Sequence, residues 1–238
     1  MALHEQHIEY RDGDTRLQGF FCHEDSYPGP LPAVLISHTW CGRDEFVERK
    51  ARRLAWHGYA TFALDMYGEG KCGKTVEENQ ALMTPFMQDR KLLARRINAA
   101  LTAVKSQSAV DARRVAAMGF CFGGLCVLDL ARSGADVRGV ASFHGILKPN
   151  GLPPNKIGAR VLIMHGYDDP MAPPEDVLAI GKELTQAGAD WQLHAYGHTV
   201  HAFTNPQATN PAGGMAYNER ADRRSWHTLL QFLEEAVR

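Results

Sequence analysis

GFCFGG, residues 119–124, joins a strand-like run to a helix-like run and places a cysteine at the junction. The strand-like run is RVAAM, at 114–118, and the helix-like run is LCVLDLARS, which begins at Leu125 and stops before Gly134. Glycines on both sides of Cys121 allow a sharp reversal and let the strand and the helix pack closely. The pattern predicts a tight strand-to-helix turn with a thiol at its tip.

Around this turn, short apolar runs alternate with helix-period segments along the chain. The opening IEYRDGDTRLQGFFCHE predicts two antiparallel strands joined by a turn at residues 12–14. Runs typical of buried strands follow at 33–37, 60–65, 114–118, 138–143, 160–166 and 191–196. Helical patterns occupy 46–56, 76–104 with a break or kink at Pro85, 125–133, 175–187 and 218–237. This alternation predicts an α/β fold with a mostly parallel central sheet, helices on both faces and antiparallel N-terminal strands.

The bulk composition argues against several classes of protein. A length of 238 residues suits a single domain over residues 1–238. With 26 basic and 27 acidic side chains, the chain has no net field to attract nucleic acid or an anionic membrane. Its five cysteines are irregularly spaced, and no apolar run reaches the roughly 18 residues of a membrane span. Since the opening MALHEQHIEY also lacks the apolar core of a signal peptide, we expect a cytoplasmic protein.

Three of the predicted strands end in side chains with catalytic chemistry. Cys121 follows RVAAM, Asp169 follows RVLIMHG, and His201 follows WQLHAY. Ligand chemistry in such sheets gathers at the carboxyl ends of the strands. The chain order of nucleophile, acid and histidine is that of the α/β-hydrolase triad, and GxCxG is its nucleophile turn with a thiol in place of a hydroxyl. These residues are the predicted catalytic set.

Each of the three has a physical reason for its role. The amino end of the helix after Cys121 favours a thiolate, and a nearby imidazolium favours it further. His201 would take the thiol proton, while a carboxylate on its other nitrogen would hold the ring and stabilise its charge. We select Asp169 as that carboxylate, because Asp168 is better explained as an exposed turn or cap residue. The competing interpretation of Cys121 is a small buried hydrophobic residue.

The same motifs resemble a known family. GFCFGG, HGYDDPMAP and VHAF, with HTWCGRDEF and ALDMYGEGK upstream, are similar to the dienelactone hydrolase family of α/β hydrolases from about Ala33 to the C-terminus. The resemblance implies that Asp169 and His201 serve as acid and base. It also implies an oxyanion hole formed by the backbone N–H groups of Trp40 and Phe122, which would stabilise charge on a carbonyl oxygen.

Two positions depart from the family pattern. Family members commonly carry a glutamate that keeps the cysteine protonated until substrate arrives, and Thr39 stands at that position here. We therefore hypothesise a resting thiolate of Cys121 paired with protonated His201, which would be more open to oxidation. The founding enzymes also place an arginine four residues after the histidine to bind a substrate carboxylate, where this chain has Asn205. Dienelactone itself is then a doubtful substrate.

Other patterns suggest different functions. GEGKCGKT, residues 68–75, matches the phosphate-binding loop GxxxxGK[ST], but neither RVAAM nor RGVASF ends in the aspartate that would bind magnesium. His194, His198 and His201 form an H-x3-H-x2-H pattern, although a strand-to-loop conformation would scatter these rings. We therefore expect no metal site from these three histidines.

One basic cluster also needs an interpretation. Arg90, Lys91, Arg95 and Arg96 lie opposite the apolar stripe of their helix, so the sequence favours a solvated face. Arg90 is kept as a candidate substrate-pocket residue with Thr39 and Asn205, because it could turn toward an acidic substrate.

The sequence thus predicts a carboxylic ester or lactone hydrolase that needs no cofactor or metal and works through an acyl-enzyme. Its expected partner is a small ester or lactone, with no nucleic acid and no membrane; a homodimer is left open. One alternative is a ligand-binding or redox-sensing protein that retains the fold and uses Cys121 as the sensor. Another is a nucleotide hydrolase that uses GEGKCGKT.

Overall fold

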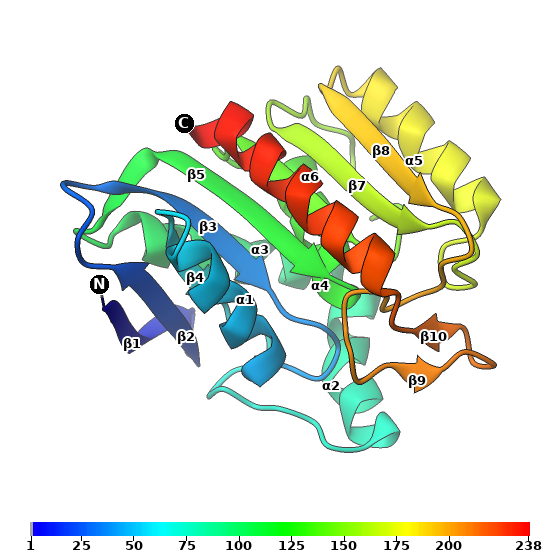
Figure 1. Cartoon of the computed structure of the whole chain (residues 1–238), viewed down its shortest axis with the longest axis horizontal. Coiled ribbons are helices and arrows are strands. Elements are labelled where there is room, and N and C mark those ends of the chain that lie inside the picture. The colour runs from blue at the N-terminus through cyan, green and yellow to red at the C-terminus, as the bar shows by residue number, and fades with distance from the viewer. Residues whose placement is uncertain (1) are drawn as a thin grey trace.

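The computed structural model describes residues 2–238, and its centre is a mixed sheet of eight strands. Their order across the sheet is β1-β2-β4-β3-β5-β6-β7-β8 (Figure 1). Strands β3 to β8 run parallel, while β2 pairs antiparallel with both β1 and β4. The strands of this sheet are β1 (Leu3–Asp12), β2 (Thr15–Glu24), β3 (Leu31–Ser37), β4 (Ala60–Ala63), β5 (Val110–Phe120), β6 (Gly139–Phe143), β7 (Arg160–Gly166) and β8 (Trp191–Tyr196). The predicted α/β class with antiparallel N-terminal strands is confirmed.

Helices cover both faces of the sheet. The helices are α1 (Glu45–Ala55), α2 (Val76–Gln88), α3 (Arg90–Lys105), α4 (Phe122–Arg132), α5 (Pro174–Gln186) and α6 (Glu219–Val237). Helices α1 and α6 lie in front of the sheet in Figure 1, and their apolar side chains pack with that face. Those of α3, α4 and α5 pack on the other face. Strands buried on both faces explain why the parallel strands read as continuous apolar runs.

The segment predicted as one kinked helix over 76–104 is two helices. Pro85 lies inside the last turn of α2, and the break comes at Asp89. The Asp89 carboxylate accepts hydrogen bonds from the N–H groups of Lys91 and Leu92, both at 3.0 Å, and so caps α3. The capping residue, rather than the proline, sets the boundary.

Two further details differ from the sequence prediction. Strand β5 begins at Val110, four residues before RVAAM, and a small hairpin of β9 (Thr209–Asn210) and β10 (Met215–Ala216) was not predicted. An isolated bridge joins His201 to Met215, so this hairpin supports the loop that carries His201. Among residues 2–238, no helix has the length and apolar character needed to cross a membrane.

Candidate active site

Cys121 occupies a strained turn between β5 and α4. Its backbone has φ 57° and ψ −118°, an unusual conformation for a residue other than glycine. A Cβ atom on Gly119 would overlap the carbonyl of Gly123, and one on Gly123 would overlap the carbonyls of Ser37 and His38. The glycines of GFCFGG are therefore required by close packing of β5, α4 and the end of β3. The Cys121 residue itself stays partly exposed.

His201 and Asp169 meet beside this turn, although they lie 32 residues apart in the chain. His201 Nδ1 donates a hydrogen bond of 2.8 Å to Asp169 Oδ2, and the residues are only 1% and 2% exposed. The other carboxylate oxygen of Asp169 accepts from the backbone N–H of Met171 at 2.8 Å. Asp168 is exposed, as expected for a turn carboxylate. The structure thus pairs His201 with Asp169, the carboxylate selected from the sequence.

The thiol and the imidazole shift each other's pKa. Burial alone would raise the pKa of Cys121, but the charge and proximity of His201 lower it below its ordinary value. Burial would likewise lower the pKa of His201, but the Cys121 thiolate and the hydrogen bond to Asp169 raise it. His201 Nε2 has no well-formed hydrogen bond in the described part of the chain. Both pKa shifts are in the direction that favours a Cys121 thiolate beside a charged His201.

Two backbone N–H groups also face the sulfur. Those of Phe122 and Trp40 further lower the pKa of Cys121, which places both donors near Sγ. Phe122 is the first residue of α4, whose amino end has no side-chain cap. That end is open to a negative charge. The Trp40 and Phe122 N–H groups expected from the family resemblance therefore both lie near Sγ of Cys121.

His144 is a neighbour of the site that sequence reasoning missed. It follows β6, has φ 37°, and is 1% exposed. Its ring packs edge-on against His201 with 5.1 Å between centroids, and its Nε2 lies 2.8 Å from Thr204 Oγ1. Burial and the nearby His201 charge hold the pKa of His144 well below its usual value. His144 is therefore neutral and packs against the His201 ring without adding charge. The sequence signal that could have indicated His144 is a histidine followed by a glycine directly after the apolar strand RGVASF.

Two of the candidate substrate-pocket residues are engaged locally. Thr39 is partly buried, and its Oγ1 accepts a 3.3 Å hydrogen bond from the N–H of Cys41. Asn205 Oδ1 accepts a 3.0 Å hydrogen bond from the N–H of Gln207 and closes a turn. The Asn205 carboxamide therefore stabilises its own loop.

The solvated face predicted for the basic cluster of α3 is wrong for two of its members. Arg90 is 9% exposed and donates from Nε to Asp129 Oδ2 at 2.7 Å. Arg96 is buried and donates to Asp12 Oδ2 at 2.9 Å. Each buried guanidinium has a buried carboxylate as its partner. Arg90 also donates to the carbonyl of Pro149, so it is held within the fold instead of reaching toward Cys121.

The loop GEGKCGKT does not present its N–H groups to a phosphate. Its Gly68 and Gly70 both donate 2.8 Å hydrogen bonds to the carboxylate of Asp65. The same carboxylate accepts from the N–H groups of Tyr67 and Gln18, at 2.9 and 3.0 Å. An internal anion already occupies the place that a phosphate would take, which argues against the nucleotide-hydrolase alternative.

The three histidines of the H-x3-H-x2-H pattern do not form a cluster in the described residues. His201 bonds Asp169, His194 lies 3.2 Å from Gln192 Oε1, and His198 is exposed. The grouping of metal-binding side chains found within residues 2–238 is a different one, formed by His4, His23 and Asp25.

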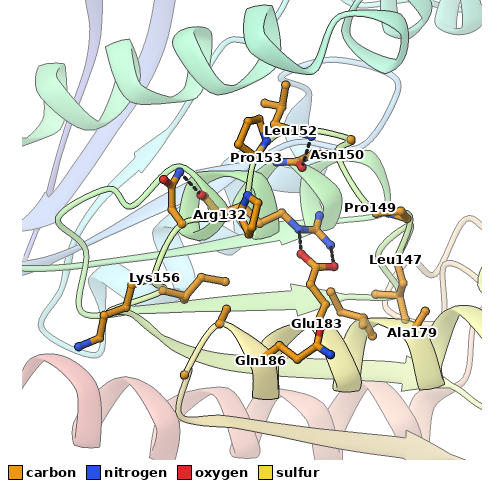
Figure 2. Close-up of a pocket in the computed structure, with 17 residues that line it drawn as sticks. Arg132, Leu147, Pro149, Asn150, Leu152, Pro153, Lys156, Ala179, Glu183 and Gln186 are labelled. Carbon is orange, nitrogen blue, oxygen red and sulfur yellow. Dashed lines mark hydrogen bonds and ion pairs between the residues drawn. The ribbon is translucent and has the colours of Figure 1, made fainter.

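A hollow of about 760 Å³ lies elsewhere on the molecule (Figure 2). It is lined by α5, the end of α4 and the loop at 147–157, and none of the candidate site residues lines it. Arg132 and Glu183 form a two-pronged ion pair at 2.6 and 2.8 Å beside it. These two charges are paired with each other, so they do not mark the hollow as a second candidate site.

Comparisons with known proteins agree with this geometry. Residues 17–237 match the model of the dienelactone hydrolase family. A Caenorhabditis elegans protein named "Uncharacterized protein K02A2.1" is 39% identical over 145 residues, covering 59% of this chain and 92% of that protein. A Yersinia pestis protein named "Putative carboxymethylenebutenolidase" is 25% identical and covers 92% of this chain and 84% of its own length.

A solved structure gives a close spatial match. The dienelactone hydrolase-like promiscuous phosphotriesterase P91, from metagenomic libraries, superimposes with a TM-score of 0.95 at 35% identity. The match covers 99% of each chain. The eight-stranded sheet is therefore an α/β-hydrolase sheet, and the predicted fold class is confirmed.

Proposed function

The chain belongs to the dienelactone hydrolase family and is a hydrolase, and on that premise we propose that it cleaves carboxylic esters or lactones with Cys121 as nucleophile. The observation that carries the proposal is the 2.8 Å hydrogen bond between His201 and Asp169, with His201 close enough to Cys121 to lower the pKa of its thiol. Among the described residues, this pair supplies the base beside Cys121 and the carboxylate that orients it.

In the proposed reaction, the Cys121 thiolate attacks the carbonyl carbon and forms a carbon–sulfur bond. The carbonyl oxygen takes the negative charge and is stabilised by the N–H groups of Trp40 and Phe122. As the carbon–oxygen bond to the leaving group breaks, His201 Nε2 donates its proton to the departing alkoxide. The product of this first half is a thioester on Cys121 and a free alcohol, or the opened chain of a lactone.

Water completes the cycle. Neutral His201 takes a proton from a water molecule, whose oxygen attacks the thioester carbonyl. The second tetrahedral intermediate uses the same two N–H groups and expels the Cys121 thiolate, releasing the acid. Asp169 stays ionised throughout; it orients the His201 ring and stabilises its charged form.

The names of relatives guide the choice of substrates. The Yersinia pestis relative is named for a butenolide, and P91 is described as a promiscuous phosphotriesterase. We propose a panel of p-nitrophenyl acetate, simple lactones and a phosphotriester for this chain. A phosphotriester could use the same nucleophile, because its phosphoryl oxygen also becomes anionic upon attack.

The test compares native protein with Cys121→Ala. We expect the alanine variant to lose at least about a thousandfold in kcat/KM toward p-nitrophenyl acetate and the lactones. Cys72→Ala, which removes an exposed free thiol, is the matched control and should retain native rates. Mass spectrometry of the native enzyme, quenched during turnover, should show one acyl group on the peptide that contains Cys121. Equal rates for native protein and Cys121→Ala on every substrate would end the proposal.

A further inference from the structure

A second group of potential ligands lies at the edge of the sheet. His4, His23 and Asp25 each present one nitrogen or oxygen atom, and these atoms all lie within 4.8 Å of one another. The group is formed by the N-terminal hairpin and shares no residue with the Cys121 site. The proposed reaction does not use these side chains.

The backbone explains why the three side chains meet. His4 of β1 is the direct antiparallel partner of His23 of β2, so their side chains project from the same face. Their ring centroids are 5.0 Å apart, with the planes tilted by 30°. Asp25 lies in the turn directly after β2, which brings its carboxylate beside His23. Its N–H donates to the carbonyl of Ala2 at 3.3 Å, which holds the end of β2 against β1.

One of the rings is held by its neighbours. His23 is partly buried and packs against Phe21, with 5.5 Å between ring centroids. Its Nδ1 lies 3.6 Å from Asp25 Oδ1, longer than a good hydrogen bond. His4 and Asp25 are exposed, so small rotations can bring all three atoms to about 2.0–2.2 Å from a shared ion. A water molecule would supply a fourth ligand.

We propose that His4, His23 and Asp25 form a binding site for a divalent transition-metal ion of the zinc class, which cross-links the edge strand β1 to the end of β2. Two imidazoles and one carboxylate match the nitrogen and oxygen ligands that Zn²⁺ accepts, and leave one position for solvent. The ion ties the edge strand β1 to its one neighbour, β2. An edge strand gains most from such a tie, because only one side of it is hydrogen-bonded.

The experiment measures Zn²⁺ binding to the full chain, with its own N-terminus and without a polyhistidine tag. Competition with a coloured chelator should give one Zn²⁺ per chain. His4→Gln, His23→Gln and Asp25→Asn should each weaken that binding by at least about tenfold. His227→Gln, which changes an exposed histidine on α6, is the matched control and should bind as the native protein does.

Two further measurements separate this site from the thiols. Cys121→Ala should bind Zn²⁺ with native affinity, and the Co²⁺-loaded protein should lack the strong near-ultraviolet absorption of a thiolate ligand. At a Zn²⁺ concentration about a hundred times Kd, the native Tm should rise by several degrees, and that of His23→Gln should not. Native affinity in any of the three ligand variants, or loss of binding in Cys121→Ala, would overturn the assignment.

Discussion

Two glycine-rich turns connect a strand to a helix in this molecule, and they use their backbone N–H groups in opposite ways. The turn at 119–124 joins β5 to α4, and the turn at 68–75 joins β4 to α2. At the first, the N–H of Phe122 points toward Cys121 and no side chain caps the helix. At the second, the glycine N–H groups bind the Asp65 carboxylate, and Thr75 caps α2.

This difference separates the turn proposed to be reactive, at 119–124, from the structural turn at 68–75. Both turns contain residues with positive φ and precede a helix, so their glycine patterns alone do not distinguish them. Free donors next to a nucleophile can stabilise charge that appears during a reaction. Donors that already bind an internal carboxylate contribute to folding instead. The occupancy of the N–H groups, more than the glycine spacing, predicts which turn can carry chemistry.

The largest expected effect comes from replacing Asp169, the carboxylate that holds His201 beside the turn at 119–124. Asp169→Asn should reduce kcat toward p-nitrophenyl acetate by about ten-thousandfold, because an amide cannot stabilise the charged His201 ring and can favour the wrong tautomer. Asp168→Asn, at the exposed neighbouring position, is the matched control and should stay within about twofold of native. Steady-state kinetics on both variants decide the matter. A similar loss in both would mean that Asp169 has no special role.

The second effect concerns the resting state of the thiol. Because His201 and the two N–H groups lower the pKa of Cys121, we expect its thiolate to persist below the ordinary thiol pKa and to disappear only as the pH falls through the lowered value. At pH 6.5, iodoacetamide should modify native Cys121 about a hundred times faster than Cys121 in His201→Asn. Peptide mass spectrometry between pH 5 and 10 measures both rates.

Cys72 supplies an internal control for this experiment. Its side chain is exposed enough to react, but burial and nearby Asp44 raise its pKa. Its alkylation should therefore rise only at alkaline pH, and equally in both proteins. If native Cys121 follows the same alkaline curve, the hypothesis of a resting thiolate fails.

The third effect breaks the structural turn. In Asp65→Asn one carboxylate oxygen becomes an NH₂ group. The N–H groups that donated to that oxygen, including that of either Gly68 or Gly70, then lose their acceptor. We expect a loss of about 2 kcal/mol in the free energy of unfolding, a factor of about 30, and a Tm lower by roughly 4–8 °C. Thermal and denaturant unfolding measure the change. Glu69→Gln, an exposed change in the same loop, should have little effect.

The comparison of the turns also predicts a negative result. Native protein titrated with ATP and Mg²⁺ should show no saturable binding, since Asp65 occupies the donors of the loop. Unchanged unfolding of Asp65→Asn, or micromolar binding of ATP by the native chain, would contradict the structural reading of this turn.

The sequence predicted what depends on local patterns. Apolar runs located the strands, and the glycines around Cys121 located the sharp turn, because steric constraints there act over a few residues. His201 and Asp169 could be selected because parallel strands deliver their ends to one edge. The environment of Arg96 could not be predicted, since its partner Asp12 lies 84 residues away. His144 was missed for the same reason: its contact with His201 is purely tertiary.

Arg90 allows the smallest and most specific effect to be measured. Its guanidinium is paired with Asp129 inside the fold, so it should not select substrates by charge. Arg90→Met should leave the ratio of kcat/KM for a carboxylate-bearing p-nitrophenyl ester to that for a neutral one within about twofold of native. The same variant should lower the Tm, because the buried Asp129 carboxylate loses a partner. Lys91→Met, at the exposed adjacent position, should change neither quantity. A loss confined to the carboxylate-bearing ester would instead return Arg90 to the substrate pocket.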